Sequence, residues 1–256
     1  MERRHARGVQ AVARAAVVAA SALTDSLVVT CEHGGNRVPA RYRRLFRGLQ
    51  GLLQTHAGYD LGALATAREL SAAFKAPLVA ATVTRLLVDL NRSIGHPRLH
   101  GEAIRALSRE ERERILADHY RPYRMETEAR IRQAIARGRR VIHISSHSFT
   151  PELKGKVRAA DVGLLYDPAR TGEARLCARW KVALAQAFPQ LRVRRNYPYD
   201  GTDDGFMPYL RRRFRPTAYV GVEIEVNQAI VVGAPRRWAA VRAALIASLR
   251  AALVEA

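Results

Sequence analysis

Short apolar runs alternate with stretches of helical periodicity along most of the chain. Apolar runs bounded by turn residues predict strands, and here they cover residues 27–30, 77–83, 86–90, 141–147, 163–167 and 218–228. Apolar residues spaced three and four positions apart predict helices over residues 63–74, 108–138, 174–188 and 235–254. Strands that alternate with helices are typical of an α/β protein with a mixed or mostly parallel sheet.

Two of the predicted helices carry recognisable signals. Ser108 is a favourable N-cap, and Glu111 completes a capping box with it. Pro122 predicts a break within the same helix, because proline lacks the N–H that a helix interior needs. Pro235 fits the first turn of the closing helix.

Length and composition favour a single compact unit. A chain of 256 residues that is 48% hydrophobic can bury a sizeable core. We expect residues 26–256 to form one domain and residues 1–25 to be an N-terminal extension or helix. A basic start precedes an apolar patch there, but Arg14 interrupts it, which argues against a signal peptide. No apolar run reaches the roughly 18 residues of a membrane span. Cys31 and Cys177 lack metal-site spacing and fit a reducing, cytoplasmic protein.

The formal net charge of +20 raises the question of nucleic acid as a partner. Nearly all of this charge comes from arginine, and the chain is also rich in alanine, a combination typical of GC-rich coding sequences. The arginines are spread along the predicted helices and are not interleaved with aromatic residues. We therefore expect small anionic substrates, and not nucleic acid, to be the partners that this charge attracts.

Polar residues stand where two of the predicted strands end. His33 follows the first strand together with Glu32 and Asn36, and open α/β sheets bind ligands at the carboxyl ends of their strands. For His33 alone, a histidine that caps a turn is the simpler interpretation. Asn91 and Arg92 follow residues 86–90, and such a pair can hold a carboxylate through the guanidinium and the amide.

A second histidine candidate lies on the strand predicted over residues 141–147. His143, Ser145 and His147 share one face of it. Two histidines four positions apart on a strand do not easily share a metal ion, so we expect only one of them to be a ligand. His147 is the better candidate because it lies nearer the loop, whereas we expect His143 to be a hydrogen-bonded interior residue.

Two glutamates lie on the last predicted strand, among residues that otherwise read as buried. Glu223 and Glu225 share one face, and buried carboxylates are costly unless they are paired, hydrogen-bonded or facing a site. A glutamate beside a metal-activated water is the base that metal-assisted hydrolysis requires. A structural ion pair with an arginine is the alternative for either residue. The loop at residues 196–205 could close over a small polar ligand, and we expect its Tyr199 to contact the substrate.

The order of these motifs is more specific than any one of them. Along the chain they read CEHGGNRVP, GYDLGA, DLNRS, ISSHSFTP, DVGLLYD, NYPYDG and GVEIEVNQ. From about residue 27 to residue 228 the chain resembles the N-formylglutamate amidohydrolase family, which is related to zinc carboxypeptidases and aspartoacylase-like deacylases. The resemblance implies a three-layer α/β/α sandwich with a mixed, mostly parallel central sheet, of the phosphorylase/hydrolase-like and zinc-carboxypeptidase-like kind.

The resemblance also implies roles for individual residues. His33 and His147 resemble the histidine ligands of one zinc ion, Asn91 and Arg92 resemble the grip on a substrate carboxylate, and Glu225 resembles the general base. The implied reaction cleaves the amide of an N-acylated amino acid, such as N-formyl-L-glutamate, to formate and the amino acid. For the namesake substrate this is a step of histidine degradation.

One position departs from the family pattern. Relatives place a zinc-binding glutamate three residues after the first histidine, and this chain has Asn36 there. Asparagine is a poor zinc ligand because it brings no charge to offset the ion. Asn36 could coordinate through its oxygen, Glu32 or Asp60 could replace it, or the metal could be absent. The alternatives for function are therefore hydrolysis of another acyl amino acid or small peptide, and non-catalytic binding of anionic metabolites.

Overall fold

The structure, a computed structural model, describes residues 25–254. The predicted N-terminal extension or helix lies, apart from Asp25, outside these residues. The strands are β1 (Asp25–Cys31), β2 (Leu78–Ala80), β3 (Arg140–Phe149), β4 (Glu152–Leu153), β5 (Lys156–Val157), β6 (Val162–Leu165), β7 (Val193–Arg195) and β8 (Tyr219–Asn227). The α-helices are α2 (Gln50–Leu53), α3 (Ala63–Phe74), α4 (Glu102–Arg105), α5 (Arg109–Ile115), α6 (Arg121–Ala136), α7 (Thr171–Ala187), α8 (Phe206–Arg213), α9 (Gln228–Val231) and α10 (Pro235–Val254). A 3-10 helix, η1 (Ala40–Phe46), and a π-helical turn, η2 (Leu116–Tyr120), complete them.

The central sheet has six strands in the order β2-β1-β3-β8-β6-β7. The pairs on either side of β1 and between β3 and β8 are parallel, whereas β6 runs antiparallel to β8. The mixed, mostly parallel sheet that the sequence predicted is therefore confirmed. A separate hairpin of β4 and β5 follows the carboxyl end of β3.

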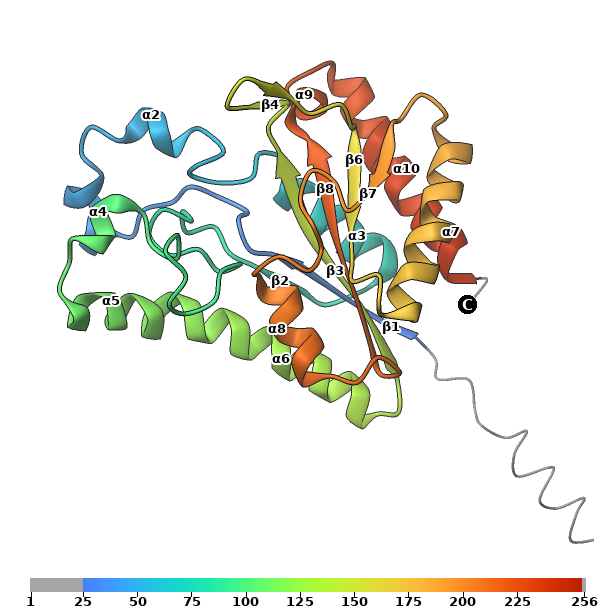
Figure 1. Cartoon of the computed structure of the whole chain (residues 1–256), viewed down its shortest axis with the longest axis horizontal. Coiled ribbons are helices and arrows are strands. Elements are labelled where there is room, and N and C mark those ends of the chain that lie inside the picture. The colour runs from blue at the N-terminus through green and yellow to red at the C-terminus, as the bar shows by residue number, and fades with distance from the viewer. Residues whose placement is uncertain (1–24, 255–256) are drawn as a thin grey trace, which may run out of the picture.

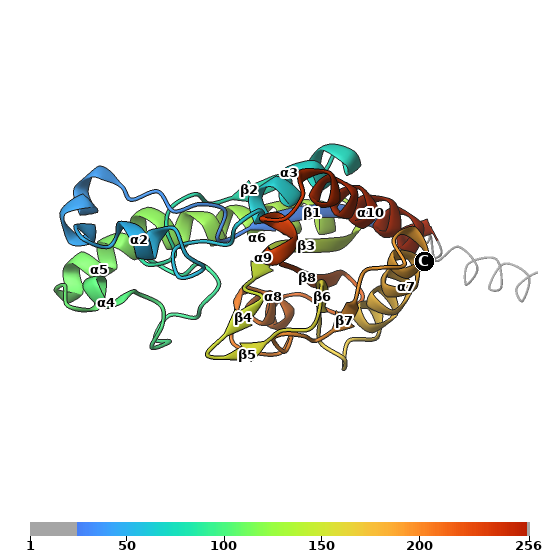
Figure 2. The same ribbon diagram turned by 90° about the horizontal axis from the view of Figure 1, so that it is seen from above.

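Helices cover both faces of this sheet and complete the three layers. On one face, α3, α7 and α10 pack over a core that includes Ile142, Ile144 and Trp180, and Figure 1 shows α7 beside α10 on that side. On the other face, α6 and α8 pack over a second core that includes Val141 and Tyr219. In both views α2, α4 and α5 gather at the end of the molecule away from α7 and α10 (Figures 1 and 2).

Two expectations about single elements were wrong. Residues 86–90 form no strand: their apolar side chains fill the second core while their backbone makes turns, with Leu87 N–H bonded to Thr84 and Asp89 N–H bonded to Leu99. The helix over residues 108–138 is not broken at Pro122. It runs on through α5, η2 and α6 along one axis (Figure 1), because π-helical bonding just ahead of Pro122 accommodates a residue without an N–H.

The remaining predicted elements occur where expected, and Ser108 accepts a hydrogen bond from the Glu111 N–H at 3.1 Å as an N-cap should. No helix among residues 25–254 is both long and apolar enough to cross a membrane.

Candidate active site

Strand alternation gathers polar side chains on one face of the sheet at its carboxyl edge. On β3 and β8 the register pairs Ser145 with Glu223 and His147 with Glu225, and all four point to the face that α6 and α8 cover. Glu32 leaves the adjacent β1 toward the same face, and the Ser145 hydroxyl donates a hydrogen bond to it at 2.5 Å. Three neighbouring parallel strands therefore deliver their polar ends to one place, as open α/β sheets do at ligand sites.

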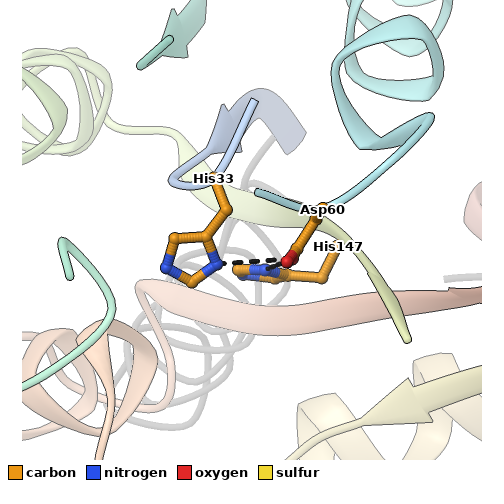
Figure 3. Close-up of side chains that lie close together, drawn as sticks. All are labelled: His33, Asp60 and His147. Atoms are coloured by element: carbon orange, nitrogen blue, oxygen red, sulfur yellow. Dashed lines mark hydrogen bonds and ion pairs between the residues drawn. The ribbon is translucent and has the colours of Figure 1, made fainter. Parts of the chain in front are cut away.

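At the centre of this place, Asp60 lies between two histidines (Figure 3). Its Oδ2 atom is 3.3 Å from Nδ1 of His33 and 2.8 Å from Nδ1 of His147. The backbone N–H of Asp60 bonds to the His33 carbonyl at 2.9 Å, which fixes the loop that carries Asp60 against the end of β1. All three side chains are buried, and one ligand atom from each lies within 4.8 Å of the others. This group could hold a metal ion.

Each histidine also has a carboxylate at its other ring nitrogen. Nε2 of His33 lies 2.7 Å from Asp89, and Nε2 of His147 lies 3.2 Å from Glu32, although the latter pair is not aligned for a hydrogen bond. Metal-binding histidines commonly use one nitrogen for the ion and the other for such a carboxylate, which fixes the ring. The two Nδ1 atoms that face Asp60 are thus the ones left for coordination.

The outer carboxylates are themselves held in place. Arg85 donates to Asp60 Oδ1 at 3.1 Å and to Asp89 Oδ2 at 2.7 Å, so one guanidinium bridges both acids around His33. Tyr123 of α6 donates to Glu32 Oε1 at 3.0 Å. Since each buried acid has a fixed donor, the ligand atoms are held in position before any ion arrives.

The electrostatics of the centre favour positive charge. Burial acts against the charged form of His147, but its contacts with Asp60 and Glu32 raise its pKa well above the usual histidine value. Burial also acts to raise the pKa of Asp60, yet the nearby charge of His33 and the hydrogen bonds from both histidines hold it well below the usual range. A site that keeps carboxylates ionised and attracts protons to a histidine suits a divalent cation, which would take the place of those protons.

Glu225 has a different environment from the other acids. Burial, together with the negative charges of Asp60 and Glu223, raises the pKa of Glu225 to about 8. Its Oε2 is buried and has no hydrogen-bond partner among the described residues. Glu223, by contrast, accepts a hydrogen bond from Asn91 at 3.3 Å. An unpartnered carboxyl with a pKa near neutrality, opposite a candidate metal ligand, is the environment expected of a general acid–base.

The comparisons with known proteins agree with this geometry. The family model described as N-formylglutamate amidohydrolase matches residues 25–232. This chain belongs to the N-formylglutamate amidohydrolase family. Membership makes it a hydrolase that acts on amide bonds. No curated protein matches it.

Two solved structures share the fold. A gene product from Agrobacterium tumefaciens is 30% identical, with a TM-score of 0.78 over 91% of this chain and 92% of that one. An N-formylglutamate amidohydrolase from Ralstonia eutropha JMP134 is 20% identical, with a TM-score of 0.68 over 91% of this chain and 94% of that one. The similarity therefore extends over the whole sandwich.

Within this family framework, most of the predicted site residues come together. His33, His147 and Glu225 lie in or beside the centre, and Asn91 reaches it through Glu223. Arg92 turns toward the loop at residues 196–205, where its Nη1 donates to the Asp204 carbonyl at 2.7 Å.

The amide nitrogen of Asn36 is bound to another part of the chain. It donates to the Leu53 carbonyl at 3.0 Å and to the Gln54 side chain at 3.2 Å, so this side chain ties the loop after β1 to the C-terminal end of α2. Of the alternatives for the third ligand, Asp60 is the one that meets both histidines, and Glu32 faces only His147.

Arg85 is the residue that sequence reasoning missed. Its signal was weak: a single arginine just ahead of the apolar run at residues 86–90. His143, in contrast, is the interior residue that was predicted, since it lies 2.8 Å from the hydroxyls of both Thr30 and Tyr219.

Proposed function

We propose that this chain is a zinc-dependent hydrolase that cleaves N-formyl-L-glutamate to formate and L-glutamate, with one ion held by His33, Asp60 and His147. The observation that carries the proposal is the convergence of two histidine Nδ1 atoms on one buried carboxylate oxygen, at 3.3 and 2.8 Å. Two histidines and one carboxylate form the protein ligand set of well-known catalytic zinc sites. The family name supports the substrate.

Zinc, when bound, would polarise the formyl carbonyl and lower the pKa of a water molecule to about 7. Glu225 takes the proton of the attacking water as the new C–O bond forms at the formyl carbon. The C–N bond then breaks, and Glu225 passes that proton to the departing amine nitrogen, so that formate and the free amino acid leave. The buried, unpartnered Oε2 of Glu225 supports this role.

Substrate orientation falls to the residues around the centre. Asn91 and Arg92 would hold the substrate α-carboxylate, because an adjacent amide and guanidinium offer the donors that a carboxylate accepts. Arg92 forms no ion pair with a carboxylate in the part of the chain that the structure describes, which leaves its charge available. Tyr199, on the loop at residues 196–205, would contact the substrate.

The test joins metal content with a substrate panel. We expect near-stoichiometric zinc in the purified protein by elemental analysis, and loss of zinc in both His33→Ala and His147→Ala. His119→Ala, a histidine of η2 outside the centre, is the matched control and should retain zinc. The zinc-loaded protein should release formate from N-formyl-L-glutamate faster than it releases the corresponding acid from acetyl or dipeptide analogues.

Each part of the proposal can fail separately. A wild-type protein that takes up no zinc even on incubation would contradict the metal assignment. Full zinc with faster cleavage of another acyl amino acid or a small peptide would keep the chemistry and correct the substrate. Arg92→Ala should mainly raise KM and retain zinc, so zinc loss in this variant would contradict its role as a substrate anchor.

A further inference from the structure

We propose that Arg158 is a second carboxylate anchor of the active site, which selects acyl amino acids with an acidic side chain. The inference rests on the proposed function and adds a residue to it. Arg158 lies between β5 and β6, at the edge of the sheet where β3 and β8 end.

Two contacts place Arg158 directly beyond the catalytic residues. Its guanidinium carbon lies 5.9 Å from the ring centre of Phe149, which follows His147 on the same face of β3. Its carbonyl accepts a hydrogen bond from Asn227, which follows Glu225 on the same face of β8, at 3.4 Å. The two residues that Arg158 contacts therefore lie two positions, roughly 7 Å along the strand, beyond His147 and Glu225.

Tyr199 holds the guanidinium over the site. Nη1 of Arg158 donates to the Tyr199 hydroxyl at 3.1 Å, and its carbon lies 4.9 Å from the centre of that ring. The loop that carries Tyr199 rests on the sheet at Gly163, where an added Cβ would meet the Tyr197 carbonyl at 2.0 Å and Glu225 Cβ at 3.2 Å. Tyr199 and Arg158 are therefore fixed at the side of Glu225.

Arg158 is also free to bind an anion. Among residues 25–254 it forms no ion pair with a carboxylate, whereas Arg85 is occupied by Asp60 and Asp89. Arg92 stands at the other end of the same loop, on Asp204, and likewise has no carboxylate partner there. Two free guanidiniums at the two ends of one loop fit the two carboxylates of an acyl glutamate: Arg92 for the α-carboxylate and Arg158 for the side chain.

The experiment measures kcat/KM of the zinc-loaded protein on N-formyl-L-glutamate and on N-formyl-L-glutamine, which lacks only the second charge. We expect Arg158→Ala to lose about 10- to 100-fold on the glutamate substrate, mainly through KM, and to change little on the glutamine substrate, because a charged hydrogen bond is lost in one case only. Arg158→Lys should recover part of the loss. Arg194→Ala is the matched control, since Arg194 stacks on Tyr197 of the same loop at the same 4.9 Å but belongs to the edge strand β7.

Equal losses on both substrates, or no loss on either, would overturn the assignment while leaving the proposed function intact. If the wild type cleaves neither substrate, the proposed function fails, and calorimetry with glutarate, which keeps both carboxylates, still decides about Arg158. Binding that is at least 10-fold weaker in Arg158→Ala than in Arg194→Ala would support the anchor. Equal binding, or no binding to the wild type, would overturn it.

Discussion

The two faces of the central sheet come from the same strands but have different chemistry. On β3, Ile142 and Ile144 are buried in the apolar core under α3 and α10, whereas His143, Ser145 and His147 point to the opposite face. Because successive side chains of a strand alternate, each strand can contribute to a core and to a site at once. The polar residues of the active site therefore interrupt only one of the two apolar cores, and only at the carboxyl edge of the sheet.

Hydrogen bonding explains how the polar face stays folded. Unpaired buried polar groups are costly, and on this face nearly every one has a partner: His143 has Thr30 and Tyr219, and Glu32 has Ser145 and Tyr123. At the centre, two buried atoms of the described residues lack a hydrogen-bond partner: Nε2 of His147, which lies 3.2 Å from Glu32 without the alignment of a hydrogen bond, and Oε2 of Glu225. Among the acids of the centre, Glu225 is therefore the one with a buried oxygen that has no hydrogen-bond partner, which supports the base role proposed for it.

Of the substitutions that test the difference between the two faces, Glu225→Gln on the polar face should have the largest effect, and the effect should be on kcat. We expect kcat to fall by about 10²- to 10⁴-fold, because the amide cannot take the proton of the attacking water. Zinc content and the denaturation midpoint should stay near wild type. Glu223→Gln is the matched control on the same face, and a larger kcat loss there than at Glu225 would exchange the two roles.

A substitution on the opposite face should lower stability and leave kcat unchanged, which is the reverse of the pattern expected for Glu225→Gln. Ile224 lies between these two glutamates in the chain but is fully buried in the other core. We expect Ile224→Ala to lower the free energy of unfolding by about 2–5 kcal/mol, through lost burial and the cavity left behind. At a temperature where the variant is folded, kcat should stay close to wild type, and a kcat loss as deep as that of Glu225→Gln would show that the faces are not independent. Chemical denaturation and steady-state kinetics measure the two quantities.

A smaller effect concerns pH, and it distinguishes the two histidines of β3. Burial lowers the pKa of His143 from its usual 6.5 to about 4, with the charge of Glu32 opposing and that of Arg211 assisting. Between these values the unfolded chain binds a proton that the folded chain does not, so His143 makes unfolding easier as the pH falls from 7 to 4. In His143→Gln, studied with chelator, we expect this part of the acid destabilisation, roughly 3 kcal/mol, to disappear. Identical pH profiles for variant and wild type would contradict a neutral, buried His143.

Features that depend on neighbouring residues could be predicted from the sequence, whereas features that depend on contacts between residues far apart in the chain could not. Local periodicity is enough to place α3 over Ala63–Phe74, as the sequence predicted. It fails at residues 86–90, because an apolar run of that length fills a core equally well from a turn. Arg85 joins Asp60, 25 residues away, and Asp89, so its role exists only once the loops are folded together.

The smallest expected effect is at Asn36, where sequence and structure point to different roles. The sequence places it at the ligand position of the family motif, but its amide nitrogen donates to the Leu53 carbonyl at the end of α2. We expect Asn36→Ala to lower the free energy of unfolding by only about 1 kcal/mol, the usual value of one such hydrogen bond, and to leave zinc content unchanged. Asp60→Asn is the informative partner, because it keeps the shape but removes the charge that would offset the ion, and it should lose zinc. Zinc loss in Asn36→Ala with retention in Asp60→Asn would return the third ligand to the family position and remove Asp60 from the centre.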